Sequence, residues 1–169
     1  MRRRDEQPRG QALVEFALAI PLVLLLMAGL LDLGRIVFVN NSLSDGARHG
    51  ARHAIVDPRS ATYCAEIDGA IRSAIREQPL STYTVTYRTV SKDGSITNTY
   101  VVCQNGADGG GKAAMAANNT VAPGDRVTIE LGADVELALG FIAQAAGRNT
   151  FNLEAESTMQ VTFVPPVTP

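Results

Sequence analysis

The sequence predicts an α+β protein in which one long N-terminal helix, a second helix and a four-stranded antiparallel sheet share a core. Three observations predict this fold. The run from Phe16 to Leu31 carries no charge, and residues 60–77 repeat apolar side chains at helical spacing. Later segments alternate apolar and polar side chains, which is typical of a sheet with one face packed on helices and one face in water.

The first predicted element is a helix over residues 11–56, with a transmembrane segment at about 12–39. The charge-free run makes about 24 Å of helix, whereas the hydrocarbon core of a bilayer is about 30 Å thick. With Ala12, Leu13 and Val14 added, the helix reaches about that thickness. The Glu15 carboxylate then lies inside or at the edge of the bilayer. A charge there is costly and usually has a partner, which can belong to another chain. Pro21 is expected to kink or loosen this helix.

Past the membrane, small residues recur on the same helix at helical spacing, namely Gly46, Ala47, Gly50 and Ala51. They are expected to let another backbone approach closely. Each glycine weakens a helix by about 1 kcal/mol, so packing is expected to hold this part of it.

Residues 57–169 are predicted to form a domain on the outer side of the membrane. Ser60 can cap a helix over 60–77 that Pro79 closes, with an apolar stripe of Cys64, Ile67, Ile71, Ala74 and Ile75. Strands are expected over residues 82–90, 96–104, 125–137 and 151–163, the first two joined by a turn at Lys92-Asp93-Gly94.

Two connections have distinct compositions. Residues 105–120 are rich in Gly, Ala and Asn without an apolar face, and are predicted to be a flexible surface loop. Leu139, Phe141 and Ile142 are expected to form an apolar loop or helical turn between the last two strands.

Cys64 and Cys103 both fall in the part predicted to lie outside the cell membrane. In an oxidising compartment such a pair indicates a disulfide. Closing a loop of about 40 residues contributes roughly 4 kcal/mol in the chain-entropy model. Two separately buried thiols are the alternative.

A short basic leader ends in Gly10, a glutamate follows at the fifth position, and Phe16 and the apolar helix come next. This arrangement resembles the processing site of type IV prepilins and pseudopilins. The string from Gly10 to Leu18, with Pro21 and Asp32-Leu33-Gly34-Arg35, is similar to the TadE-like family. Its members are minor pseudopilins or pilus-assembly proteins of the tight-adherence (Tad, Flp) type. The resemblance is close over the first third of the chain and extends to the rest only as a pilin-like layout.

The resemblance implies that a prepilin peptidase cuts after Gly10 and leaves Gln11 as the new N-terminus. Glu15, with Phe16 beside it, would then set the register between subunits, because its carboxylate can meet the ammonium group of a neighbouring chain. The implied partners are the peptidase, other pilins or pseudopilins, the pilus assembly platform and the lipid bilayer. No cofactor is implied. In the plainer alternative, Glu15 only reaches to the headgroup region.

The arginines before the apolar run, at positions 2, 3, 4 and 9, place the N-terminus in the cytoplasm. The protein is therefore expected to cross the bacterial inner membrane once, with its C-terminal domain periplasmic or extracellular. Two alternatives remain: a secreted protein whose signal is cleaved near Met27-Ala28-Gly29, and an uncleaved anchor that carries an exoplasmic binding domain.

The remaining motifs do not indicate an enzyme. The formal charge of −2 becomes −4 when residues 1–10, with four Arg and two acids, are removed, so no basic patch for nucleic acid remains. Asp45, His49, His53 and Asp57 share a helical face, but neighbouring arginines oppose a metal ion. Residues 106–113 differ from a phosphate-binding loop because Ala113 replaces the hydroxyl that binds magnesium. An exported enzyme is the least supported function.

Overall fold

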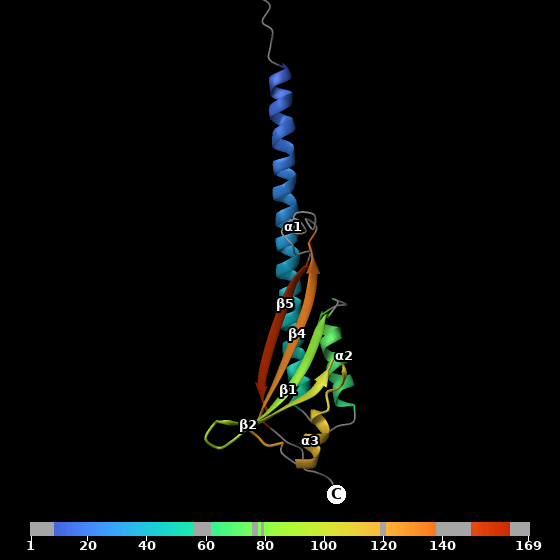
Figure 1. The fold of residues 1–169 in the computed structure, drawn as a ribbon, viewed down its shortest axis with the longest axis vertical. Helices are drawn as coiled ribbons and strands as arrows, with labels where there is room; N and C mark the ends of the chain where they lie inside the picture. The colour runs from blue at the N-terminus through green and yellow to red at the C-terminus, as the bar shows by residue number, and fades with distance from the viewer. Residues whose placement is uncertain are drawn as a thin grey trace, which may run out of the picture.

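The computed structural model describes residues 9–55, 62–75, 78, 80–118, 121–137 and 150–162. In chain order its elements are α1 (Arg9–Ala54), α2 (Tyr63–Ile75), β1 (Thr82–Val90), β2 (Ile96–Gln104), β3 (Ala107–Asp108), α3 (Gly111–Asn118), β4 (Arg126–Glu136) and β5 (Thr150–Gln160). One half of α1 stands free of the other elements, and the sheet and α2 lie along its other half (Figure 1).

The predicted α+β fold is confirmed, with one more strand than expected. The sheet is antiparallel, in the order β3-β2-β1-β4-β5. The additional strand, β3, has two residues and pairs with the end of β2, where Cys103 lies opposite Asp108. The two longest strands, β4 and β5, pack their apolar face on α1.

The prediction of a loop over residues 105–120 was wrong for the part of this segment that the structure describes. Asn105 and Gly106 turn the chain with positive φ angles, and β3 and α3 follow. A Cβ atom at Gly109 or Gly111 would lie 2.7 or 2.5 Å from the Val101 carbonyl oxygen, so these glycines let the segment lie directly on β2. Met115 of α3 is only 1% exposed. One methionine and close backbone packing replace the apolar stripe that the sequence lacks.

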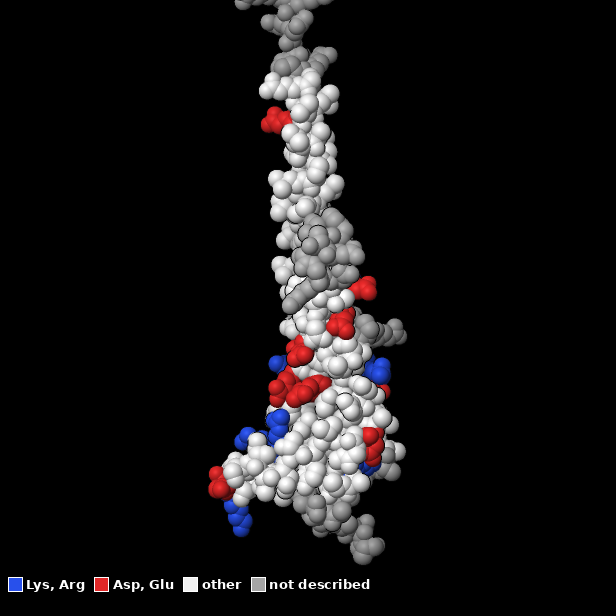
Figure 2. Space-filling view, in the orientation of Figure 1, with Lys and Arg blue, Asp and Glu red and all other residues white. Residues whose placement is uncertain are grey.

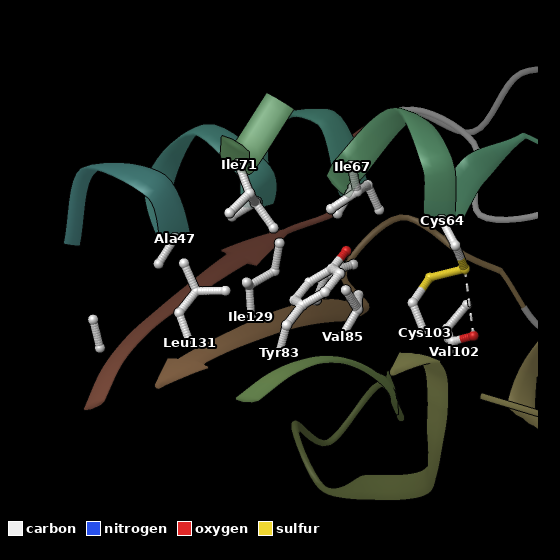
Figure 3. Packing of buried hydrophobic residues seen from close by; sticks show 14 of the residues in the cluster. Ala47, Cys64, Ile67, Ile71, Tyr83, Val85, Val102, Cys103, Ile129 and Leu131 are labelled. Carbon is white, nitrogen blue, oxygen red and sulfur yellow. Dashed lines mark hydrogen bonds between the residues drawn. A yellow bond between two sulfur atoms is a disulfide. The ribbon is translucent and has the colours of Figure 1, made fainter. Parts of the chain in front are cut away.

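The small residues of α1 lie where the prediction required close packing, but side chains of the same chain approach them. A Cβ atom at Gly50 would lie 2.7 Å from Ile71 Cγ1 of α2 and 2.8 Å from Ile129 Cδ1 of β4. Gly46 is similarly close to Ile75 and Leu131. Figure 3 shows this layer, in which α1 and α2 lie side by side and their apolar side chains pack on the sheet.

Replacing Gly50 by alanine is therefore expected to lower the free energy of unfolding by about 1 kcal/mol. The methyl group forces two buried isoleucines apart, and the resulting strain exceeds the gain in helix propensity. Gly69 of α2 is the matched control, because a Cβ atom there would meet nothing within 4 Å. Gly69→Ala is expected to raise stability by about 0.5–1 kcal/mol. Urea unfolding of the two variants measures both values. If the two substitutions change the free energy of unfolding in the same direction, Gly50 is not required by the packing.

Two side-chain hydrogen bonds join α2 to α1, one at each end of α2. The Tyr63 hydroxyl donates a hydrogen bond to the Ala54 carbonyl oxygen at 2.7 Å, and the Ser42 hydroxyl donates to the Ile75 carbonyl oxygen at 3.2 Å. The α-helical assignment of α1 continues through Pro21. The predictions for Ser60, for Pro79 and for the apolar turn at residues 139–142 lie outside the described residues.

Candidate functional site

The free half of α1 presents apolar side chains to its surroundings. All the side chains from Gly10 to Met27 are exposed, although most of them are apolar. The helix from Gly10 to Ala54 is the one helix among the described residues that is long and apolar enough to cross a membrane. Figure 2 shows this half uncharged apart from an acidic side chain near its end, and Glu15 is the only acid between residues 10 and 31. This half of α1 therefore has the character of a membrane anchor.

The predicted processing site lies at the start of α1. Helix α1 begins at Arg9, so Gly10 and Gln11 are its second and third residues, and both are exposed. A Cβ atom at Gly10 would meet nothing within 4 Å. Packing in the folded chain therefore does not require glycine at this position.

The predicted register contact lies on the same segment. Glu15 and Phe16 are both exposed on α1, one turn beyond Gln11. The structure therefore brings the four residues of the predicted processing and register sites together on one short stretch of helix. It leaves them accessible to a peptidase or to a second chain.

The predicted disulfide is present and lies in the domain, away from the free half of α1. It joins Cys64 of α2 to Cys103 of β2, with a Cα–Cα distance of 5.6 Å (Figure 3). Both residues are buried. The disulfide therefore fixes α2 against the sheet and has no place in the processing site.

Two charges just after the apolar run were not predicted to have a structural role. Asp32 is only 8% exposed, and the Arg35 guanidinium donates a hydrogen bond from Nη1 to the Glu136 carbonyl oxygen at 3.2 Å. Glu136 is the last residue of β4. The signal in the sequence was the i, i+3 spacing of these charges, which puts both near one side of α1.

The face of α1 that carries Asp45, His49 and His53 is exposed to solvent. Asp57 lies outside the described residues. No group of three potential ligands among the His, Cys, Asp and Glu residues that the structure describes could hold a metal ion.

Residues 106–113 do not have the geometry of a phosphate-binding loop. The strands before and after the turn, β2 and β3, are antiparallel. The loop between β3 and α3 is closed by a hydrogen bond from the Gly110 amide to the Asp108 carboxylate at 3.1 Å. Its glycines serve the packing on Val101 described above.

A shallow depression of about 580 Å³ lies on the solvent face of β1, β4 and β5. Its acidic lining residues are Glu130, Glu154 and Glu156, and Thr82 and Thr84 line it from β1. Figure 2 shows acidic side chains gathered in this part of the domain. The sheet therefore offers a negatively charged outer surface.

Tyr83 of β1 is buried near Asp68, a partly exposed residue of α2. Burial raises the pKa of the Tyr83 phenol, and the nearby Asp68 carboxylate raises it further. The Asp68 carboxylate accepts a hydrogen bond from Arg72 Nε at 2.7 Å, and it raises the pKa of Arg72. Because Tyr83 is closed off from solvent by the core, its side chain contributes to packing and does not line a cleft.

Comparison with known proteins finds one similarity. A family model described as "TadE-like protein" matches residues 10–52. The match begins at Gly10 and covers the free half of α1 and most of the half that packs on the domain. It agrees with the resemblance found in the sequence. No curated protein matches the chain, and no solved structure does.

Proposed function

We propose that this chain is a membrane-anchored minor pseudopilin of a Tad-type pilus assembly system. A prepilin peptidase cuts it after Gly10, and it then acts as an initiating, tip or assembly-platform subunit. The similarity of residues 10–52 to TadE-like proteins and the long apolar helix α1 fit a membrane protein associated with this type of pilus. The N-terminus lies in the cytoplasm and the domain lies outside the bacterial inner membrane.

The observation that carries the proposal is the position of the match on the fold. It starts at the predicted cleavage residue, runs along the part of α1 that the domain leaves uncovered and continues through most of the part that packs on the domain. A cut after Gly10 creates an α-amino group on Gln11, four residues before Glu15. In a bundle of such helices the carboxylate of one chain meets the ammonium of its neighbour. Each charge would be costly alone in apolar surroundings.

The mass of the protein isolated from its native membrane tests the processing step. A mature chain that begins at Gln11 supports the proposal. An intact Met1 supports instead an uncleaved anchor that displays the domain for a ligand. Cleavage after residue 27 would indicate a secreted protein and would overturn the proposal.

Replacing Glu15 by glutamine is expected to leave cleavage unchanged and to lower incorporation into pilus assemblies by about tenfold. Glutamine keeps the size of the side chain but removes the charge that pairs with the neighbour's ammonium, and a loss of about 1.4 kcal/mol corresponds to tenfold. Incorporation is measured as the fraction of protein that co-purifies with sheared or detergent-extracted assemblies. Glu154→Gln removes an exposed carboxylate of the sheet and is expected to have no effect. If the two variants are incorporated equally, Glu15 has no register role.

A further inference from the structure

Helix α1 can cross the bilayer with either of two spans of about 20 residues in the hydrocarbon core. A hydrocarbon core of about 30 Å needs about 20 helical residues. One choice spans residues 12–31 and places Glu15 inside the core. The other spans residues 16–35 and leaves Glu15 in the cytoplasmic headgroup layer, but it brings Asp32 and Arg35 to the outer edge of the core.

The structure shows how Asp32 and Arg35 can lie at the outer edge of the hydrocarbon core, as the span 16–35 requires. Asp32 is buried within the protein, and Arg35 is bonded to the end of β4. Asp32 is thus shielded by the protein, and Arg35, although exposed, has a hydrogen-bond acceptor within the protein. Glu15, in contrast, is exposed on the free helix, so in the first choice it would face hydrocarbon directly.

Apolar side chains around Arg35 favour the same choice. Leu33, Val37 and Phe38 of α1 are exposed although they follow the charge-free run, and Phe38 is 57% exposed. Phe151, the second residue of β5, is 47% exposed and pairs with Val135 next to Glu136. These four residues, here called the collar, surround the level of Arg35 and continue the apolar surface of α1 onto the sheet. Figure 1 shows this end of β4 and β5 nearest the free half of α1.

We propose that the collar rests in the outer headgroup layer of the membrane before assembly. The occupant of this surface is lipid, because the collar is continuous with the helix surface that crosses the bilayer. The domain thus contacts the membrane directly, through the end of its sheet. Glu15 then stays at the cytoplasmic surface until the subunit is drawn outward. The proposal rests on the membrane anchor within the proposed function, and not on cleavage or on pilus assembly.

The chain has no tryptophan, so a single introduced tryptophan reports on its own surroundings. The test uses the full chain, one copy per lipid nanodisc, with phosphatidylcholine brominated either near the headgroup or deep in the acyl chain. Phe151→Trp and Phe38→Trp probe the collar. Leu24→Trp probes the middle of the apolar run. Ile96→Trp is the matched control, since Ile96 is 52% exposed at the start of β2, at the other end of the sheet.

The proposal predicts that shallow bromines reduce the emission of both collar variants by roughly twofold and that their emission is shifted to the blue relative to Ile96→Trp. Leu24→Trp should be quenched most by the deep bromines. If Leu24→Trp is quenched and Phe151→Trp behaves like Ile96→Trp, the contact of the domain with the membrane is refuted while the anchor stands. If Leu24→Trp is not quenched, the anchor itself is refuted, and the proposal fails with it. Unchanged urea midpoints confirm that each exposed substitution leaves the fold intact.

Discussion

Replacing Gly10 by valine is expected to lower the rate of maturation by about 100-fold and to leave the fold unchanged. A Cβ atom at Gly10 would meet nothing within 4 Å, so the valine disturbs no contact in the folded chain. The effect arises in the peptidase, whose site must accept the residue before the scissile bond and rejects the added bulk. The mass of the membrane-extracted protein, followed over time after induction in cells with active peptidase, measures the rate.

Gly29 supplies the matched control for this prediction. It lies on the same helix, and a Cβ atom there would also meet nothing within 4 Å. Gly29→Val is expected to mature at the rate of the native chain. If Gly10→Val also matures normally, the basic segment before it is not a leader of the proposed kind. If both variants fail to mature, the defect lies in membrane insertion and not in recognition of Gly10.

The parts of the fold that could be predicted from the sequence are those in which one pattern repeats over many residues. The alternation from Val127 to Val135 gave the buried face of β4, and the helical stripe that includes Ile67 and Ile71 gave the buried face of α2. In each, five or more positions obey one period, so a single exception does not change the result.

Features that depend on one side chain could not be predicted in this way. Asp125 is 1% exposed and accepts hydrogen bonds from the Tyr87 hydroxyl, the Val90 amide and the Ala122 amide. In the sequence it is one acid in a Pro-Gly-Asp turn, where exposed acids are common. Helix α3 was missed for the same reason, since only Met115 distinguishes it from a surface loop.

In the candidate site, too, a pattern of several residues could be recognised in the sequence, whereas the roles of single side chains could not. The stretch from Gly10 to Phe16 could be proposed as a site from the sequence because it combines a basic segment, a glycine, an acid at a fixed distance and an apolar helix. The roles of Asp32 and Arg35 could not be predicted, because they depend on where the end of β4 lies. That position is set by the packing of a strand about 100 residues further along the chain.

Replacing both Cys64 and Cys103 by alanine is expected to lower the free energy of unfolding by about 4 kcal/mol. The disulfide closes a loop of 39 residues and restricts the unfolded chain more than the folded one. Alanine is preferred to serine because both sites are buried and it adds no polar group to the core. Urea unfolding of the full chain in detergent micelles measures the loss.

The reduced native protein separates the two sources of this stability. Reduction opens the loop but leaves both sulfur atoms in the core, whereas the double variant also removes their contacts. If restriction of the unfolded chain dominates, the two forms unfold at nearly the same urea concentration, and reductant has no effect on the variant. A loss below about 1 kcal/mol in both forms would mean that the chain between the two cysteines is already restricted when the domain unfolds. The hydrogen bond from Tyr63 of α2 to Ala54, the hydrogen bond from Ser42 of α1 to Ile75, and the packing on Gly46 and Gly50 would then suffice to hold α2 in place.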